Sequence, residues 1–302
     1  MGHPAAHQTE VRRTDRQPLT AVPDLDRVRP LGSDDQAETL AFLAAQPVHT
    51  VVMTSFIIDN GIESTLNRGR FYGYRNSEGR LEGVALIGHS TLIEARSPDA
   101  NRALAMTAAR LDEKVHLVMS HGDNARGFWA MMAPNGRAPR LECVEALFES
   151  SLPQLVRNCE WDVTTATLGL LEQVAAAQAE VAFTECGLDP LIRDREGFLK
   201  RVARRIEQGR VFVVVDENGK LVFKADIIAE ASGVVYLEGV YVAPEMRGRG
   251  IGSSCLAELN LRLLVDRADK VCLLSNVAFT QAHRMFERAG FRRTGECTTL
   301  FA

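Results

Sequence analysis

The chain has 302 residues, about twice a common domain length, which leaves room for one large or two ordinary domains. A hydrophobic fraction of 46% and a charged fraction of 25% are typical of a folded globular protein. The net charge of -4, from 35 basic and 39 acidic residues, argues against general electrostatic binding of nucleic acid or an anionic membrane. Any anion site must therefore be local.

Simple sequence signals limit where in the cell the protein is expected. No apolar run approaches the roughly 20 residues that span a bilayer, and residues 1–10 lack a secretory hydrophobic segment. A myristoylation motif is rejected because Ala6 stands where that motif needs Ser or Thr. The 6 cysteines never form C-x-x-C, which favours reduced thiols over a metal site or a disulfide framework. We expect a cytoplasmic protein that binds neither metal, nucleic acid nor membrane.

The first half of the chain is predicted to be a mixed domain behind a flexible tail. Residues 1–27 are rich in Pro, Arg, Asp and Thr and lack periodicity, which is typical of a tail. Residues 28–155 alternate helical and extended patterns, which predicts an α/β domain. Its helices are expected at 34–46, 99–113 and 125–132. Its strands are expected at 69–76, 81–95 and 114–120.

A second α/β series is predicted at 160–302, after a joint at 152–162. Phe198, Val202 and Ile206 repeat every four residues and form one apolar helical stripe. The helices of this half are expected at 170–187, 194–209, 280–290 and from 251 onward. Its strands are expected at 163–169, 210–216, 221–231, 233–242, 270–275 and 291–301.

Three glycines and two arginines lie between a strand and a helix from Arg247 to Gly252. The dinucleotide pattern G-x-G-x-x-G fails because Ser253 stands where its third glycine should be. A nucleoside-triphosphate loop fails because no lysine occurs between Lys224 and Lys270. Glycines at a helix start let backbone N–H groups approach a phosphate, and the positive helix end favours the anion. The segment predicts an anion site, with a ligand-free glycine turn as the alternative.

Two stretches resemble signatures of the GNAT superfamily of N-acetyltransferases. "GVYVAPEMRGRGIG" is similar to its acetyl-CoA loop, R/Q-x-x-G-x-G, and "AHRMFERAGF" is similar to its second signature. The matching residues are Arg247, Gly250, Gly252, Ala282, Phe286, Gly290 and Phe291. The resemblance covers about residues 160–302. Residues 28–151 resemble the extra N-terminal domain of a two-domain branch. This implies an α+β mixed-sheet fold in which a second, degenerate GNAT-like domain without a CoA loop precedes the acyl-CoA domain.

The resemblance also implies a reaction and a set of contacts. It implies transfer of an acetyl or other acyl group from CoA to a primary amine, carried by a small molecule or a peptide. In such folds the strand before the loop diverges from its neighbour and binds the pantetheine arm. The implied contacts to acetyl-CoA are Val240, Tyr241, Val242, Arg247, Gly248, Arg249, Gly250, Ile251, Gly252, Ser253 and Phe286.

Glu238 and Asn276 are the candidate catalytic residues. A lysine-like amine has a pKa near 10.4 and must lose a proton to attack, so a carboxylate base is useful. Glu238 stands where several superfamily members keep theirs, and Asn276 follows the facing strand. By the same analogy, the backbone N–H of Val242 is expected to stabilise the oxyanion. The alternatives are a solvent-facing or ion-paired glutamate and an asparagine that caps a turn.

Several interpretations stay open. Phe286 replaces a tyrosine that protonates the CoA thiolate in many relatives, which leaves that role to water or Tyr241. This substitution favours the alternative of a non-catalytic acyl-CoA-binding regulator, and a third hypothesis is an interaction protein with a vestigial loop. Arg201 and Arg205 border the acceptor site in the superfamily, or else form a solvated charged face. His121 is assigned no role, and the acceptor, the acyl length and the oligomeric state are undetermined.

Overall fold

The computed structural model describes residues 24–111, 113–152 and 159–302. Residues 1–23 of the predicted tail and 153–158 of the predicted joint lie outside the described residues. The helices are α1 (Gln36–Leu43), α2 (Pro47–Asn60), α3 (Pro98–Ala108), α4 (Asn124–Met132), α5 (Leu171–Cys186), α6 (Pro190–Arg193), α7 (Arg195–Glu207), α8 (Ile251–Asp266) and α9 (Thr280–Arg288). The strands are β1 (Val28–Pro30), β2 (Gly69–Arg75), β3 (Leu81–Gly88), β4 (Ser90–Ala95), β5 (Leu117–His121), β6 (Leu141–Ser150), β7 (Thr164–Thr165), β8 (Val211–Val215), β9 (Leu221–Ala231), β10 (Val234–Val242), β11 (Lys270–Asn276) and β12 (Arg292–Phe301).

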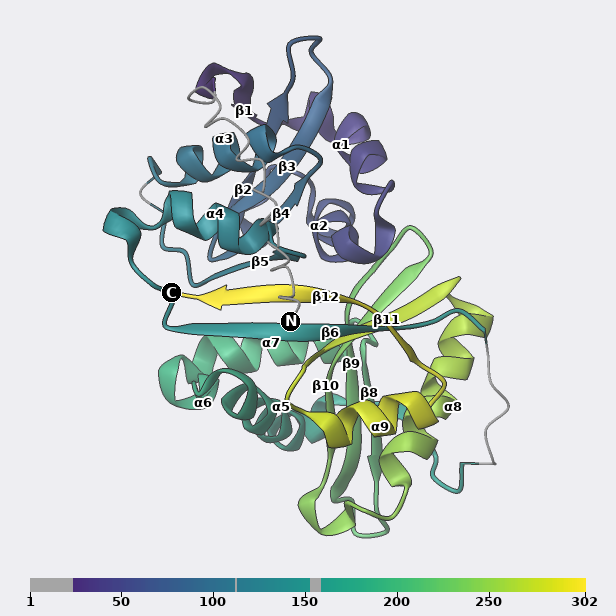
Figure 1. The fold of residues 1–302 in the computed structure, drawn as a ribbon. Coiled ribbons are helices and arrows are strands. Elements are labelled where there is room, and N and C mark those ends of the chain that lie inside the picture. The colour runs from purple at the N-terminus through teal and green to yellow at the C-terminus, as the bar shows by residue number, and fades with distance from the viewer. Residues whose placement is uncertain (1–23, 112, 153–158) are drawn as a thin grey trace, which may run out of the picture.

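The described strands form one mixed sheet, which confirms the predicted fold class. Its order is β1-β2-β3-β4-β5-β12-β6-β11-β10-β9-β8-β7. Figure 1 shows β6 and β12 crossing the middle of the molecule, between the two halves of the chain. The last strand, β12, pairs antiparallel with both β5 and β6, and β6 pairs antiparallel with β11. Each half of the sheet is thus completed by a strand from the other half of the sequence.

The second half has the predicted order of helices and strands with one addition, the short helix α6, whereas the first half differs from prediction in four places. The predicted strand over 81–95 is a hairpin, because the chain breaks between β3 and β4 at His89. Sequence patterns assigned no element to β1, α2 or β6. The helix α2 begins at Pro47 and ends before Gly61, as helix start and stop rules expect. Its β-branched residues weaken the helical signal between those two ends.

The helix α2 joins the two halves of the molecule. Its Val51 is buried with residues of β6, β9, β10 and β11 in one apolar cluster. At its C-terminal end the carboxylate of Asp59 accepts two hydrogen bonds from Arg210, at 2.7 and 3.1 Å. Packing and charge pairing therefore hold α2, a helix of the first half, against strands of the second.

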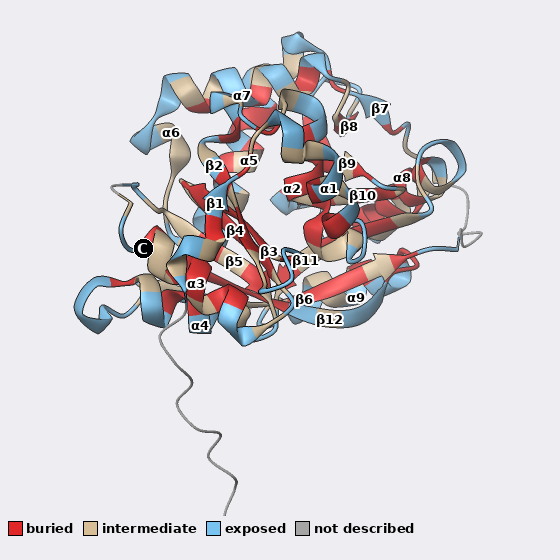
Figure 2. Ribbon diagram, turned by 90° about the horizontal axis from the view of Figure 1, so that it is seen from above, coloured by how far each residue is buried: buried red, intermediate tan, exposed pale blue. Residues whose placement is uncertain are grey.

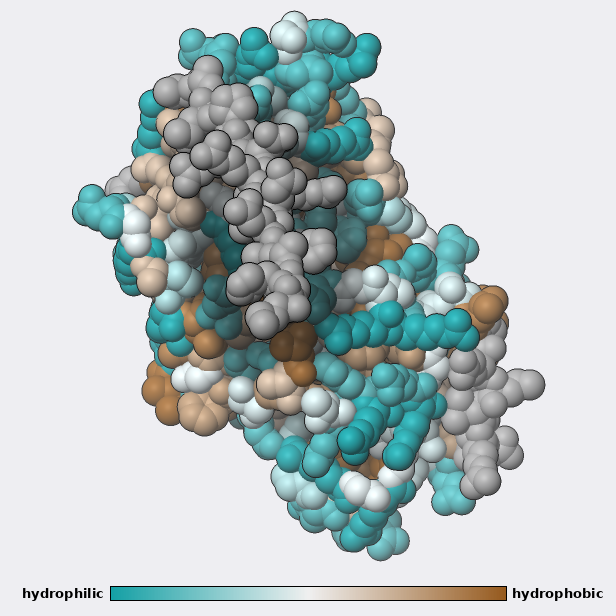
Figure 3. All heavy atoms as spheres, in the orientation of Figure 1, coloured by the Kyte–Doolittle hydropathy of each residue, from teal (hydrophilic) through white to brown (hydrophobic). Residues whose placement is uncertain are grey.

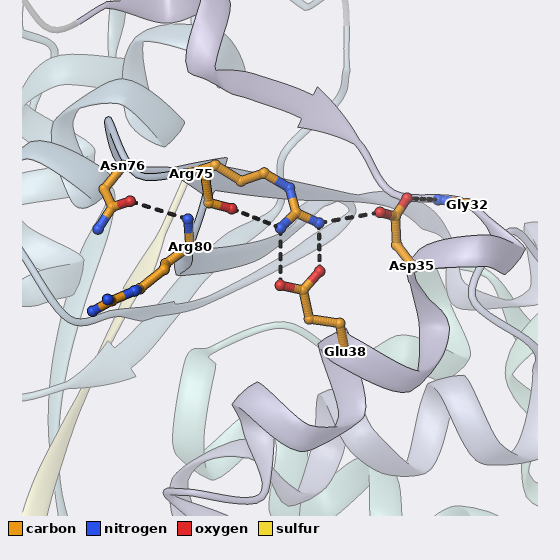
Figure 4. Close-up of polar contacts among 7 residues, drawn as sticks. Gly32, Asp35, Glu38, Arg75, Asn76 and Arg80 are labelled. Carbon is orange, nitrogen blue, oxygen red and sulfur yellow. Dashed lines mark hydrogen bonds and ion pairs between the residues drawn. The ribbon is translucent and has the colours of Figure 1, made fainter.

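An ion-pair cluster anchors α1 to the sheet, as Figure 4 shows. The guanidinium of Arg75 on β2 donates to both carboxylate oxygens of Glu38, at 2.9 and 2.5 Å. It also donates to Asp35 at 3.3 Å, and the second oxygen of Asp35 accepts from the backbone N–H of Gly32. The hydrogen bonds from Arg75 lower the pKa of Glu38. A two-point arginine–carboxylate contact of this kind fixes orientation as well as distance.

Burial follows the sheet and the inner faces of the helices, as seen in Figure 2. The predicted stripe of α7 is confirmed, since Phe198, Val202 and Ile206 are all buried. On the face in Figure 3 the described residues are mostly hydrophilic, with hydrophobic residues in small separate groups. Among the described helices, none is long and apolar enough to cross a membrane.

Candidate functional site

The candidate site begins where β10 and β11 separate. Their parallel pairing runs from Val234 opposite Lys270 to Leu237 opposite Leu273. Beyond that point both strands continue, but the described residues of β10 and β11 pair no further. The other edge of β10 stays paired with β9 as far as Val242. The result is a V-shaped opening in the middle of the sheet, as the resemblance implied.

The glycine loop closes one end of this opening. Gly248 and Gly250 have φ angles of +78° and +81°, a left-handed conformation that glycine adopts without strain. A Cβ at either position would meet no described atom within 4 Å, so the space beside the backbone is open. The helix α8 starts directly afterwards at Ile251, and its first turn has unpaired backbone N–H groups. This backbone can approach an anion closely at the positive end of a helix dipole.

Gly252 and Arg247 have structural roles in the same loop. A Cβ on Gly252 would lie 2.5 Å from the sulfur of Met285 and 2.9 Å from Val242, so only glycine permits this packing. The Nε of Arg247 donates to the carbonyl of Val242 at 2.9 Å. Its terminal nitrogen pairs with Glu180 of α5 at 3.0 Å. Arg247 therefore braces the loop against the strand and the neighbouring helix.

The opening forms a cleft of about 920 Å³. Most of the predicted site residues line it together, namely Glu238, Val240, Tyr241, Val242, Arg247, Gly248, Gly250, Ile251, Gly252, Ser253 and Phe286. Arg249 and Asn276 are not among the lining residues. The side chain of Asn276 accepts a hydrogen bond from the backbone N–H of Ala278 at 2.9 Å. The turn-cap alternative therefore describes Asn276, and the guanidinium of Arg249 lies beside the sulfur of Met246.

Arg284 and Arg288 also line the cleft, and sequence reasoning missed them. They lie four residues apart on α9, which places them on one helix face. This spacing within the second signature was the available signal. Together with Arg247 they supply positive charge to the cleft that holds the glycine loop. The residues present thus fit a polyphosphate such as that of CoA.

Carboxylates gather near the start of the opening. Glu238 of β10 and Glu185 of α5 line the cleft, and Glu145 of β6 lies near both. Burial raises the pKa of Glu145 to about 7, although the Thr299 hydroxyl donates to its carboxylate at 2.5 Å. Burial in the cleft and the negative charges of Glu238 and Glu145 raise the pKa of Glu185. Because the side chain of Glu185 is also exposed to solvent, water reduces this rise. The sequence gives no signal for this grouping, since it combines three distant elements.

Glu238 has the features of a general base. Burial raises its pKa, and the negative charge of Asp226 adds to the rise, while Arg205 and Lys224 oppose it. In the described part of the chain, no side chain donates a hydrogen bond to its carboxylate. A half-buried carboxylate with a raised pKa and no side-chain donor is a stronger base than an ordinary carboxylate.

Two aromatic residues of the cleft differ in chemistry. Phe286 is 5% exposed, and its ring meets that of Phe148 edge-on at 5.4 Å, so it acts as an apolar wall. Tyr241 is half-buried, and burial together with Glu180 raises the pKa of its hydroxyl. This hydroxyl therefore stays protonated at neutral pH.

The remaining candidates from the sequence lie outside the cleft lining. Arg205 turns inward and pairs with the buried Asp226 at 2.7 Å, whereas Arg201 pairs with Asp194 at 3.2 Å. His121 contacts Glu94 at 3.4 Å within the first half of the chain. The structure describes all six cysteines and shows them as free thiols. Within the described ranges, no cluster of three or more His, Cys, Asp or Glu could hold a metal ion.

Comparison with known proteins agrees with this geometry. The acetyltransferase (GNAT) domain family matches residues 207–293, which include β8 to β11 and the glycine loop. No curated protein sequence matches the chain significantly.

Solved structures show the same fold over most of the chain. A GNAT-family acetyltransferase from Colwellia psychrerythraea has a TM-score of 0.56 at 12% identity, covering 91% of this chain and 99% of that one. A GCN5-related N-acetyltransferase from Sphaerobacter thermophilus has a TM-score of 0.57 at 16% identity, with 90% and 93% covered. A tandem GNAT protein from the clavulanic acid biosynthesis pathway has a TM-score of 0.57 at 15% identity, with 91% and 98% covered. Residues 207–293 thus match the acetyltransferase (GNAT) domain family, and most of the chain shares its fold with solved GNAT proteins, a tandem GNAT protein among them.

Proposed function

We propose that the protein transfers an acetyl or other acyl group from acyl-CoA to a primary amine. The observation that carries this proposal is that one cleft combines three features. These are an open glycine loop at a helix N-terminus, a separated strand edge, and the carboxylate of Glu238, to which no described side chain donates a hydrogen bond. The GNAT domain match over 207–293 supports acyl transfer from CoA in general.

The cleft offers distinct contacts to the two ends of acyl-CoA. The backbone from Gly248 to Ser253 binds the pyrophosphate, and Arg284 and Arg288 supply further positive charge. The free edge of β10 from Val240 to Val242 binds the pantetheine arm by backbone hydrogen bonds. When bound, the thioester supplies an activated acyl group whose sulfur is a fair leaving group.

Glu238 takes the proton from the attacking amine, directly or through a water molecule. An amine with a pKa near 10.4 is almost fully protonated at pH 7, so a nearby base raises the reactive fraction. The half-buried position of Glu238 raises its pKa toward the working pH, which suits a general base. Tyr241 returns a proton to the departing thiolate, the role that Phe286 is unable to fill.

The first half of the chain contributes a wall on the acceptor side. Its strand β6 pairs with β11 and brings Glu145 opposite Asn276, next to the mouth of the cleft. The acceptor amine, on a small molecule or a peptide, is proposed to enter between this strand and the end of α5.

Calorimetric titration with acetyl-CoA, CoA and longer acyl-CoAs tests the proposal first. We expect micromolar binding that discriminates among the thioesters, followed by release of free thiol in a screen of primary amines. Tight binding without turnover on any amine would favour the regulator alternative. An absence of CoA binding would refute the proposal.

A further inference from the structure

Lys224 of β9 is a fully buried lysine directly behind the cleft. Its side chain is 0% exposed, yet its ammonium donates two hydrogen bonds and forms one ion pair. The hydrogen-bond acceptors are the side-chain oxygen of Gln178 at 2.6 Å and the backbone carbonyl of Gly239 at 3.1 Å, and the ion pair is with Asp226 at 2.8 Å. The ammonium thus connects the helix α5, its own strand and the cleft strand β10.

Burial of a lysine at this place is costly and needs a physical reason. An ammonium that leaves water loses a large hydration free energy, which one carboxylate only partly restores. Asp226, 1% exposed, is already paired with Arg205 at 2.7 Å. Neutralising Asp226 therefore does not by itself require Lys224. The other two contacts are to Gln178 of α5 and to Gly239, which lies in the strand that forms the cleft.

Gly239 lies at an irregularity of β10. The pairing of β10 with β9 shifts register between Glu238 and Tyr241, and Gly239 has a φ angle of +63°. A Cβ at Gly239 would lie 2.8 Å from the Lys224 ammonium and 2.2 Å from the oxygen of Gln178, so the contact is tight. Such a bulge bends its strand and changes its twist. Here it begins after Glu238, one residue beyond Leu237, which is the last residue of β10 that pairs with β11.

We propose that Lys224 is a positioning residue, whose buried ammonium holds the carbonyl of Gly239 and keeps β10 in the bent shape that opens the cleft for acyl-CoA. This inference rests on the proposed function, because it assigns a purpose to the opening. Lys224 does not touch the substrate itself. It acts through Gly239, which sets the direction of the strand edge from Val240 to Val242.

Two variants separate this role from general stabilisation. Lys224→Met and Arg205→Met each remove one of the two cationic partners of Asp226, so similar losses of stability are expected. Only Lys224→Met releases the carbonyl of Gly239. CoA binding by calorimetry is the readout, with thermal unfolding of each variant alongside.

We expect Lys224→Met to bind CoA about tenfold more weakly, corresponding to the loss of about one backbone hydrogen bond to the pantetheine arm. Arg205→Met is expected to keep its CoA affinity within about twofold. If wild-type protein binds CoA and the folded Lys224→Met variant binds it with equal affinity, the inference is overturned and the proposed function stands. Wild-type protein that fails to bind CoA would overturn both.

A second pair of variants decides the matter if Lys224→Met does not fold. Gly239→Ala places a methyl group against the ammonium, whereas Gly219→Ala introduces the same left-handed strain at φ +74° in open space. The inference requires weaker CoA binding in Gly239→Ala alone. Unchanged affinity in that variant, or an equal loss in both, would contradict it.

Discussion

Substitution of Gly250 by glutamate tests whether the glycine loop is the phosphate site. The φ angle of +81° makes any other residue strained, at about 1 kcal/mol. A Cβ there has no atom within 4 Å, so the new side chain fits without displacing the protein. The fold should therefore survive with a loss of a few degrees in Tm.

The expected effect on CoA binding follows from Coulomb's law. A carboxylate about 6 Å from one phosphate charge, at an effective dielectric constant of about 20, costs about 3 kcal/mol. This corresponds to a Kd raised about a hundredfold, and the effect should shrink at high salt. Calorimetric titration with CoA at two salt concentrations measures both quantities.

Two control variants isolate the charge from the strain. Gly219→Glu has nearly the same backbone conformation, with φ +74° and open space, but lies in the hairpin between β8 and β9. It should lose similar stability and keep its CoA affinity. Gly250→Gln matches the size of glutamate without its charge and should weaken binding less. If folded Gly250→Glu binds CoA within threefold of the wild-type affinity, the placement of the pyrophosphate is refuted. If Gly219→Glu loses as much CoA affinity as Gly250→Glu, the electrostatic reasoning is refuted.

Three further variants test the catalytic assignments. Glu238→Gln should lower kcat about 10²-fold or more. CoA affinity should stay unchanged, because the base acts on the amine. A kcat near that of wild type would exclude Glu238 as the base. Since kcat/KM requires the carboxylate form of Glu238, it should fall as the pH drops through that raised pKa. Arg205→Met removes a cation that lowers this pKa, so the acidic limb of the pH profile should move to higher pH, and an unmoved limb would assign it to another group. Asn276→Ala should lower the free energy of unfolding, measured by urea denaturation, by about 1 kcal/mol and leave kcat unchanged. A large loss of kcat would instead support a catalytic role for Asn276.

Local features of the site were predictable from the sequence. The glycine loop carries its requirements in a few consecutive residues, since left-handed φ angles at Gly248 and Gly250 need glycine wherever they occur. The stripe of α7 likewise follows from a period that three residues reveal. The turn-capping role of Asn276 was foreseen as an alternative, because an asparagine after a strand commonly bonds a nearby backbone N–H.

Tertiary structure decided the features that join distant segments. The order of β5, β12, β6 and β11 depends on strand pairing across more than 100 residues, and no local pattern encodes which edge a strand joins. The helix α2 is rich in β-branched residues, and its burial against strands of the second half stabilises it despite that composition.

The same division explains the chemistry of the cleft. The sequence by itself determined that a glycine-rich loop precedes a helix and that Glu238 lies in the preceding strand. Only the folded chain brings Glu145 and Glu185 near Glu238 and places the ammonium of Lys224 behind Gly239. A backbone requirement is local and can be read from neighbouring residues, whereas a pKa or a buried contact depends on every group that folding brings within a few ångströms.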